Sequence, residues 1–364
     1  MTGPLEGPRP PHRSQVRGGA PDEATRRSEK DRLPTTTRRL AAEPCRQPAP
    51  DAVGTVRVRV PATSANLGPA FDCAGLALTC HDVLDFTVTG SGLEVVVSGV
   101  GAGELPAGES HLVVRAFRAA CAELDWTPPG LRLVAENGIP QGRGMGSSAA
   151  AVVAGVVGAW SLCPDAHRID LDAVLRLATE LEGHPDNVAP CLLGGATLSW
   201  MEPGGARAAR LDVDPSVSPV VLVPSGTLST HVARGLLPDA VPHADAAHAA
   251  GRAALLVHAL TREPELLLAA TEDRLHQRQR TAAMPESLAL VDRLRERGLA
   301  AVVSGAGPSV LVLARPSRDG SEPTDADHLR AIDDLSPPDW AVLPLQVDPD
   351  GARVFHGNAQ VSSR

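Results

Sequence analysis

The chain has 364 residues, of which 34 are Lys or Arg and 43 are Asp or Glu, for a formal net charge of −9. Lys30 is its only lysine, tyrosine is absent, and aromatic residues make up 2%. These figures exclude kinases and ATPases that place a lysine beside the phosphates, and also Schiff-base enzymes. The acidic balance and the scarcity of aromatic rings argue against a nucleic-acid partner.

The sequence predicts no association with a membrane. It contains no run of about 18 apolar residues that could form a spanning helix. The first residues are basic but lack the apolar stretch of a secretory signal. The six cysteines are scattered without a Cys-x-x-Cys pair, which is typical of reduced thiols and predicts a cytoplasmic location.

The charge is distributed unevenly along the chain. Residues 1–50 carry ten basic and six acidic side chains together with nine prolines, so the net negative charge lies in the remainder. A segment of this kind cannot bury enough apolar surface to offset its ordering entropy. We therefore predict a disordered, basic, proline-rich tail over residues 1–50.

Secondary-structure signals begin near Val53, where residues 53–60 alternate between apolar and polar side chains, as in a half-buried strand. The sequence then predicts strands at 83–89 and 93–98, a helix at 110–125, a strand at 131–135, helices at 147–162 and 170–182, and strands at 195–200 and 218–223. The second half continues with helices at 230–237, 243–262 and 285–297, strands at 299–304 and 309–314, a helix at 325–335, and strands at 340–347 and 351–356. This order lacks a strict β-α-β alternation and favours an α+β fold.

A glycine-rich loop between a strand and a helix carries the densest chemical signal. Its residues are Pro140, Gln141, Gly142, Arg143, Gly144, Met145, Gly146, Ser147, Ser148, Ala149 and Ala150. Glycines let backbone N–H groups approach an anion, and the helix that follows adds its positive end. We interpret the loop as a phosphate cradle without a lysine.

Two other interpretations of this loop remain. Gly144-x-Gly146-x-x-Ala149, with Asp165 downstream, also fits a dinucleotide fingerprint. That motif needs its first glycine directly after the strand, whereas residues 137–143 intervene here. The loop could also have only a packing role.

Three further loops contain polar side chains among glycines or prolines. Residues 61–72 include Asn66 and Asp72, and residues 180–187 contain two glutamates, a histidine and an aspartate. These oxygen ligands suit Mg²⁺ better than zinc. Residues 304–309 read Ser-Gly-Ala-Gly-Pro-Ser and form either a plain hairpin turn or a second backbone wall for a ligand.

Together, these four segments resemble the motifs of the GHMP kinases, in the right order, and the resemblance covers residues 52–358. Within that family, residues 60–68 and 182–190 are similar to those of the homoserine kinases. Two arginine-bearing segments, 229–238 and 273–280, are similar as well. Met145 departs from the leucine that is usual in the family, and the lysine of the mevalonate-type first motif is absent.

The resemblance implies a GHMP kinase fold, with a ribosomal-protein-S5-like half and a ferredoxin-like half. It implies an ATP-binding N-terminal domain at 51–203, a C-terminal domain at 204–358 and a short tail at 359–364. The implied cofactors are ATP and Mg²⁺, and the implied reaction is phosphorylation of L-homoserine in threonine biosynthesis. The resemblance is compatible with a homodimer.

The resemblance also implies roles for individual residues. The residues implied to be catalytic are Asn66, Asp72 and Arg234. The role of Asp72 is left open between a general base and a positioning group. The implied homoserine contacts are Asn66, Asp72, His184, Asp186, Asn187, Thr230, Arg234 and Arg280. The implied Mg²⁺ ligands are Ser147 or Ser148 together with Glu182 or Glu180. The two glutamates lie about 200° apart on an ideal helix, so only one of them can face the site.

Three alternatives stay open. Arg280 could belong to a solvated basic run with Arg274 and Arg278. The chain could phosphorylate another small alcohol. It could also be a non-catalytic ATP-binding regulator that uses its basic tail as an interaction arm.

Overall fold

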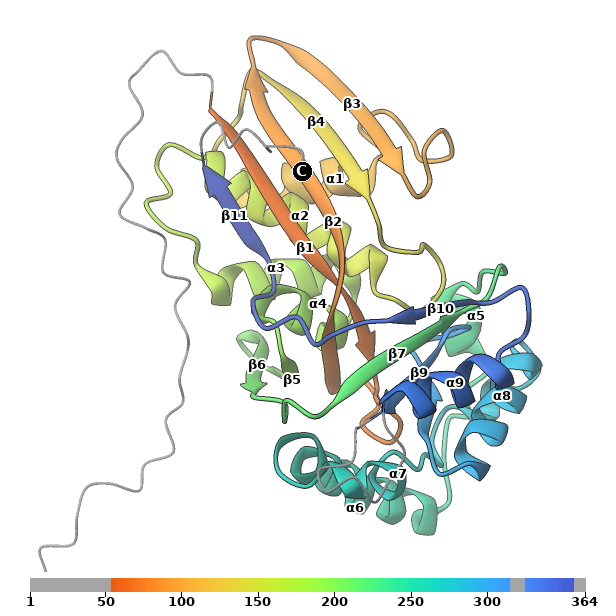
Figure 1. The fold of residues 1–364 in the computed structure, drawn as a ribbon. Coiled ribbons are helices and arrows are strands. Elements are labelled where there is room, and N and C mark those ends of the chain that lie inside the picture. Colours follow the sequence, from red (N-terminus) through yellow and green to blue (C-terminus); the bar gives the residue numbers. More distant parts are fainter. Residues whose placement is uncertain (1–53, 315–324, 357–364) are drawn as a thin grey trace, which may run out of the picture. The chain divides into compact units, whose positions relative to one another are not determined.

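The computed structural model describes residues 54–314 and 325–356 (Figure 1). The tails predicted at 1–50 and 359–364 lie outside these residues. Among the described residues, no helix combines the length and apolar character needed to cross a membrane.

The larger sheet has seven strands and contains both ends of the described chain. Its strands follow the order β11-β1-β2-β4-β3, with β5 paired to β2 and β6 paired to β5. Strands β3 and β4 run parallel and every other pair is antiparallel. The strands are β1 (Thr55–Ala65), β2 (Ala74–Thr89), β3 (Gly92–Gly99), β4 (Gly130–Asn137), β5 (Ala196–Glu202), β6 (Gly205–Leu211) and β11 (Arg353–His356).

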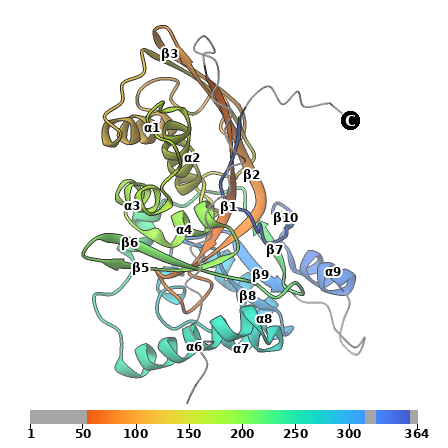
Figure 2. The ribbon, with the colours of Figure 1, turned by 90° about the vertical axis from the view of Figure 1, so that its left-hand side faces the viewer.

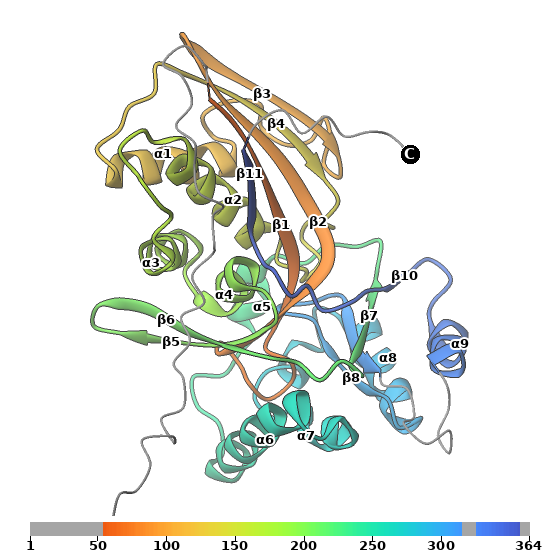
Figure 3. The ribbon, with the colours of Figure 1, turned by 60° about the vertical axis from the view of Figure 1, so that its left-hand side comes forward.

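Helices α1 (Leu112–Glu123), α2 (Ser147–Leu162), α3 (Leu171–Glu182) and α4 (Pro185–Leu193) lie on one face of this sheet (Figures 2 and 3). Helix α2 consists almost entirely of small apolar residues and is buried along most of its length. At Gly155, a β-carbon would collide with the backbone of α1 at Val113, so glycine allows the two helices to pack closely. This packing fixes the start of α2, which borders the candidate site.

The smaller sheet has four antiparallel strands in the order β10-β7-β9-β8. It comprises β7 (Ser218–Val223), β8 (Ala300–Val303), β9 (Val310–Ala314) and β10 (Ala341–Pro344). Helices α5 (Thr230–Gly235), α6 (His243–Thr261), α7 (Leu267–Ala270) and α8 (Pro285–Glu296) connect β7 to β8, and α9 (Asp325–Leu335) connects β9 to β10. This β-α-β-β-α-β order is the ferredoxin-like motif expected for the second half.

Most of the predicted elements are present, and α2 spans 147–162 as expected. Four elements were missed: helix α4, the short helix α7, strand β6 and the first half of β2. Strand β6 contains two arginines and alanines, so it lacks the β-branched residues that mark a strand. The boundary expected between the two domains, after residue 203, falls inside the hairpin that β5 and β6 form. The last strand, β11, pairs with β1 and so belongs to the first sheet.

Candidate active site

The glycine-rich loop forms one wall of a pocket between the two sheets. Gly142, Gly144 and Gly146 all adopt left-handed backbone angles, with φ of 64°, 71° and 69°. A β-carbon on Gly146 would collide with Oγ1 of Thr63, and one on Gly144 would collide with the carbonyl of Ser304. The loop therefore needs glycine both for its conformation and for its close contacts with two other segments.

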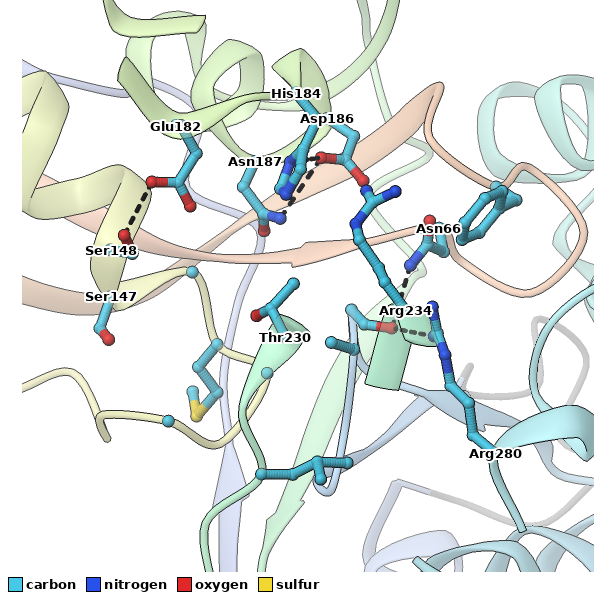
Figure 4. Close-up of a pocket in the computed structure, with 18 residues that line it drawn as sticks. Asn66, Ser147, Ser148, Glu182, His184, Asp186, Asn187, Thr230, Arg234 and Arg280 are labelled. Atoms are coloured by element: carbon cyan, nitrogen blue, oxygen red, sulfur yellow. Dashed lines mark hydrogen bonds and ion pairs between the residues drawn. The ribbon is translucent and has the colours of Figure 1, made fainter. Parts of the chain in front are cut away.

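Helix α2 begins directly after this loop, at Ser147, and its first residues border the pocket (Figure 4). A 16-residue helix offers its unpaired N–H groups and the positive end of its dipole at this point. No side chain caps these groups. The wall is therefore suited to bind an anion such as a phosphate.

Glu182 lies at the end of α3, opposite the start of α2. Ser148 Oγ donates a hydrogen bond to Glu182 Oε2 at 2.7 Å. Burial raises the pKa of Glu182, while the bond from Ser148 acts against that shift. Glu180 is instead 60% exposed and lies 3.5 Å from Arg176, away from the pocket. Only one of the two glutamates thus faces the site.

Hard oxygen donors on this wall fit a magnesium ion. The Glu182 carboxylate and the Ser147 and Ser148 hydroxyls are ligands of the type that Mg²⁺ takes. No group of three or more His, Cys, Asp or Glu side chains in the described part of the chain could hold a metal ion alone. A cation bound here would need further oxygen ligands. The phosphates of a bound nucleotide would supply them, as they commonly do for Mg²⁺ in kinases.

The loop between β1 and β2 lies across the pocket from Glu182. Asn66 is only 4% exposed and adopts φ of 71°, which is uncommon outside glycine. Its Oδ1 accepts a hydrogen bond from the backbone N–H of Asp72 at 2.9 Å, and its Nδ2 donates to the Gly305 carbonyl at 2.9 Å. Asn66 therefore fixes the loop and joins it to the 304–309 turn of the second half.

Two arginines approach this loop from the second half. Arg234 on α5 donates to both carboxylate oxygens of Asp72, at 3.0 and 2.6 Å. Arg280 is 1% exposed, in contrast to the exposed Arg274 and Arg278, which pair with acidic residues. Arg280 is therefore not part of a solvated basic run. Both Arg234 and Arg280 line the pocket (Figure 4).

The start of α4 supplies the upper edge of the pocket in Figure 4. His184 Nδ1 lies 2.7 Å from Oδ1 of the buried Asp186, and the hydrogen bond to this carboxylate raises the pKa of His184. Asn187 Oδ1 accepts a hydrogen bond from Thr63 at 2.8 Å. Proline at the first position and aspartate in the first turn are helix-start signals, so this element could have been found in the sequence.

Comparisons with known proteins agree with this architecture. The families described as GHMP kinases N terminal domain and GHMP kinases C terminal match residues 111–195 and 248–330. A homoserine kinase from Streptomyces coelicolor is 56% identical over 301 residues, covering 82% of this chain and 94% of that protein. The chain belongs to the homoserine kinases of the GHMP kinase family.

Other members of the family are similar over the same part of the chain. The homoserine kinase of Clavibacter michiganensis is 55% identical over 303 residues, covering 82% of this chain and 93% of that protein. The solved homoserine kinase structure from Cytophaga hutchinsonii has a TM-score of 0.72 and 24% identity, and covers 85% of this chain and all of that one. The predicted GHMP kinase fold is thereby confirmed.

The structure brings most of the expected GHMP kinase site residues together. Of the glycine-rich loop, Gly142, Gly144, Met145, Gly146, Ser147 and Ser148 line the pocket, whereas Pro140, Gln141, Arg143, Ala149 and Ala150 do not. The guanidinium of Arg143 turns away and donates to the carbonyls of Gln141, Pro224 and Ser225. Ala149 and Ala150 are buried in the core. Arg143 thus ties the loop to residues 224 and 225.

Among the remaining expected residues, Asn66, His184, Asp186, Asn187, Thr230, Arg234 and Arg280 line the pocket, and Asp72 contacts it through Arg234. Gly305 and Ala306 of the 304–309 turn also line it, as a backbone wall for a ligand would, and so do Phe71 and Leu228, which the sequence did not single out as site residues. The dinucleotide interpretation is wrong, because α2 is followed by helix α3 and no strand ends near Asp165.

Proposed function

We propose that the chain transfers the γ-phosphoryl group of ATP to the side-chain hydroxyl of L-homoserine, a step of threonine biosynthesis. One observation carries this proposal: two arginines and the glycine-rich loop line opposite sides of one pocket. Figure 4 shows Ser147, Ser148 and Glu182 on one side and Asn66, Arg234 and Arg280 on the other. The names of the similar proteins support the same substrate.

The glycine-rich loop and the start of α2 would bind the phosphates of ATP. Their backbone N–H groups offer several donors to one anion without a lysine. Glu182, Ser147 and Ser148 would hold Mg²⁺. When bound, the ion would neutralise charge on the phosphate oxygens.

Homoserine is a zwitterion, and the opposite side of the pocket offers both charge signs. Its carboxylate would bind the guanidinium groups of Arg280 and Arg234, which form two parallel bonds to such a group. Its ammonium would lie near the carboxylates of Asp72 and Asp186. His184, Asn187 and Thr230 would surround the rest of the molecule.

In the transfer itself, the hydroxyl oxygen of homoserine forms a bond to the γ-phosphorus while the bond from that phosphorus to the β,γ-bridging oxygen breaks. The products are O-phosphohomoserine, ADP and the hydroxyl proton. In the free site both oxygens of Asp72 accept hydrogen bonds from Arg234, so the protein itself holds this carboxylate in place. We therefore assign Asp72 mainly to positioning, together with Asn66. Positioning and charge stabilisation are what phosphoryl transfer chiefly requires.

The test is a panel of alcohols with ATP and Mg²⁺, in which release of ADP is measured. L-Homoserine should give the highest kcat/KM, above mevalonate, galactose and a diphosphocytidyl-methylerythritol. Faster turnover of another alcohol would refute the substrate and keep the kinase. ATP binding without turnover of any alcohol would favour the non-catalytic regulator instead.

We also propose a cytoplasmic location, where ATP is available. Cys73, Cys80, Cys121, Cys163 and Cys191 are all free thiols, as expected in a reducing compartment. The homodimer stays a prediction.

A further inference from the structure

Arg280 is a buried guanidinium whose protein partners are all neutral. Its Nε donates to the Ala233 carbonyl at 3.2 Å, and its Nη1 to His276 Nδ1 at 3.0 Å and to the Gly305 carbonyl at 3.3 Å. Arg280 takes part in none of the ion pairs between described residues, whereas Arg234 and Arg278 each pair with an aspartate. Burial lowers the pKa of Arg280, but a guanidinium stays charged in proteins. The carboxylates of Asp72, Asp273 and Asp186 interact with it electrostatically but form no direct ion pair with it, so its positive charge is available to a ligand.

His276 makes two hydrogen bonds that together fix its protonation. Its ring is 1% exposed, and Nε2 lies 2.8 Å from the Gly68 carbonyl, which can only accept. Nη1 of Arg280 can only donate, so Nδ1 of His276 must accept. The two contacts are satisfied together only by the neutral ring with its proton on Nε2. Burial, which lowers the pKa of His276, favours the same neutral form.

Other groups around the ring do not replace these two contacts. Asp273 Oδ2 is 3.9 Å from Nε2, and its oxygens accept hydrogen bonds from backbone N–H groups of residues 275–277. The Phe71 ring packs against His276, with centroids 5.0 Å apart, and lies 5.7 Å from the Arg280 guanidinium carbon. His276 is thus the side chain that directs a hydrogen-bond acceptor at Arg280, while Phe71 supports both groups.

We propose that His276 is a positioning residue, which as a neutral acceptor holds the Arg280 guanidinium in the orientation that binds the substrate carboxylate. This inference rests on the proposed function, because the carboxylate is that of homoserine. The alternative is that His276 only anchors the Gly68 loop. In that case its Nε2 contact would matter, and its Nδ1 contact would not.

Two substitutions separate these roles, because each keeps one of the two contacts. In His276→Asn the side-chain oxygen can replace Nδ1 and accept from Arg280, while the contact with Gly68 is lost. In His276→Gln the amide nitrogen can replace Nε2 and donate to Gly68, while the acceptor for Arg280 is lost. We expect His276→Gln to raise the homoserine KM about tenfold or more, and His276→Asn to raise it much less, because a hydrogen bond to a charged group is lost only in the first. The ATP KM should stay unchanged in both.

The decarboxylated analogue 3-aminopropan-1-ol provides the readout that a purely structural role would not change. It keeps the hydroxyl and the ammonium of homoserine and lacks the carboxylate. If His276 acts through Arg280, His276→Gln should lower kcat/KM for homoserine while leaving kcat/KM for the analogue, or its inhibition constant, near the wild-type value. Equal losses for both compounds, or a larger loss in His276→Asn than in His276→Gln, would overturn the proposal.

Thermal unfolding of each variant shows whether it is folded, and the comparison uses only variants that unfold cooperatively. Should neither substitution fold, the ring ¹⁵N chemical shifts of His276 in the wild-type protein provide the second test. They must show a neutral ring with its proton on Nε2, and a protonated ring or a proton on Nδ1 would also overturn the proposal. If the wild-type protein does not phosphorylate homoserine, the proposed function is refuted. This result can be told apart from failure of the His276 proposal, because the wild-type assay does not depend on the comparison of variants.

Discussion

The guanidinium of Arg234 binds both carboxylate oxygens of Asp72, with Nη2–Oδ1 at 2.6 Å and Nη1–Oδ2 at 3.0 Å. Both side chains are 36% exposed, so solvent screens this pair and the two groups can separate at modest cost. The pair joins α5 of the second half to the β1–β2 loop of the first. A zwitterionic substrate carries a carboxylate for Arg234 and an ammonium for Asp72. We therefore expect homoserine to open this pair and to bind both of its members.

Replacing either site arginine by lysine should weaken homoserine binding. Lysine keeps the positive charge but loses the planar fork that forms two bonds to a carboxylate. We expect Arg234→Lys and Arg280→Lys each to raise the homoserine KM by about tenfold to a hundredfold, the range for lost charge-assisted hydrogen bonds. Initial rates at saturating ATP measure this effect.

Arg278→Lys is the matched control, because Arg278 lies two residues from Arg280 but is exposed and paired with Asp292. Its homoserine KM should stay within about twofold of wild type, as for surface ion pairs in general. An increase in Arg278→Lys equal to that in Arg280→Lys would mean that the effect comes from this segment as a whole.

Removing the charge of Glu182 should impair the use of magnesium. Glu182 accepts a hydrogen bond from Ser148 on the same side of the pocket, and its carboxylate is the acidic metal-ligand candidate at the start of α2. We expect Glu182→Gln to lower kcat by about a hundredfold and to raise the Mg²⁺ concentration needed for half-maximal rate. Titration of Mg²⁺ at fixed ATP gives both quantities.

Glu180→Gln serves as its control, two residues away on the same helix. Glu180 is 60% exposed and contacts Arg176, so its substitution should leave the Mg²⁺ dependence unchanged. A larger effect at position 180 than at position 182 would contradict the assignment drawn from the structure.

The sequence predicted the residues of this site better than their arrangement. Periodicity located α2, and the glycines before it identified the loop, because left-handed backbone and close contacts both require glycine. The helix geometry of 3.6 residues per turn showed that only one of Glu180 and Glu182 could face the site. It could not show which one, since that depends on how α3 packs against α2.

Other features depend on contacts between segments far apart in the chain. Arg143 looks like a phosphate ligand in the sequence, yet it donates to the carbonyls of Pro224 and Ser225, which no local pattern indicates. Burial of Arg280 likewise depends on Ala233 and Gly305, which lie 47 and 25 residues away. Local patterns therefore identify candidate groups, while tertiary contacts decide which of them face the ligand.

Stability should depend on pH through Asp82, which lies where β2 meets the approach to the glycine-rich loop. Asp82 Oδ1 accepts hydrogen bonds from the backbone N–H groups of Gly138 and Ile139, at 2.8 and 2.9 Å. Burial raises its pKa from 3.8 to about 6, although these bonds oppose the shift. Between these values the folded state keeps a proton that the unfolded state has lost. The contribution to the unfolding free energy is thus complete below about pH 4 and is lost by about pH 6, with a total of about 3 kcal/mol for two pKa units.

Urea unfolding between pH 4 and 7 gives the unfolding free energies of wild type and Asp82→Asn. The difference between the two measures the contribution of Asp82 at each pH. The asparagine cannot ionise, and its side-chain oxygen still accepts a hydrogen bond. We expect the unfolding free energy of wild type to fall relative to the variant as pH rises from 4 to 6, and the difference to stay constant above that. Parallel curves throughout would show that Asp82 titrates normally.

The contact of α1 with α2 leads to a stability prediction that opposes helix propensity. Replacing glycine by alanine inside a helix usually stabilises it by up to about 1 kcal/mol. At Gly155, however, the added β-carbon would collide with the Val113 carbonyl and lie 2.8 Å from the β-carbon of Ala116. We therefore expect Gly155→Ala to lower the unfolding free energy by about 1–3 kcal/mol, as overpacked cores do.

Gly251→Ala is the matched control within α6, because no atom lies within 4 Å of the β-carbon that it would add. This variant should raise the unfolding free energy by up to about 1 kcal/mol, following helix propensity alone. Urea unfolding midpoints of the two variants should thus move in opposite directions from that of wild type. If Gly155→Ala were as stable as Gly251→Ala, the close approach of α1 to α2 would not be what requires glycine at position 155.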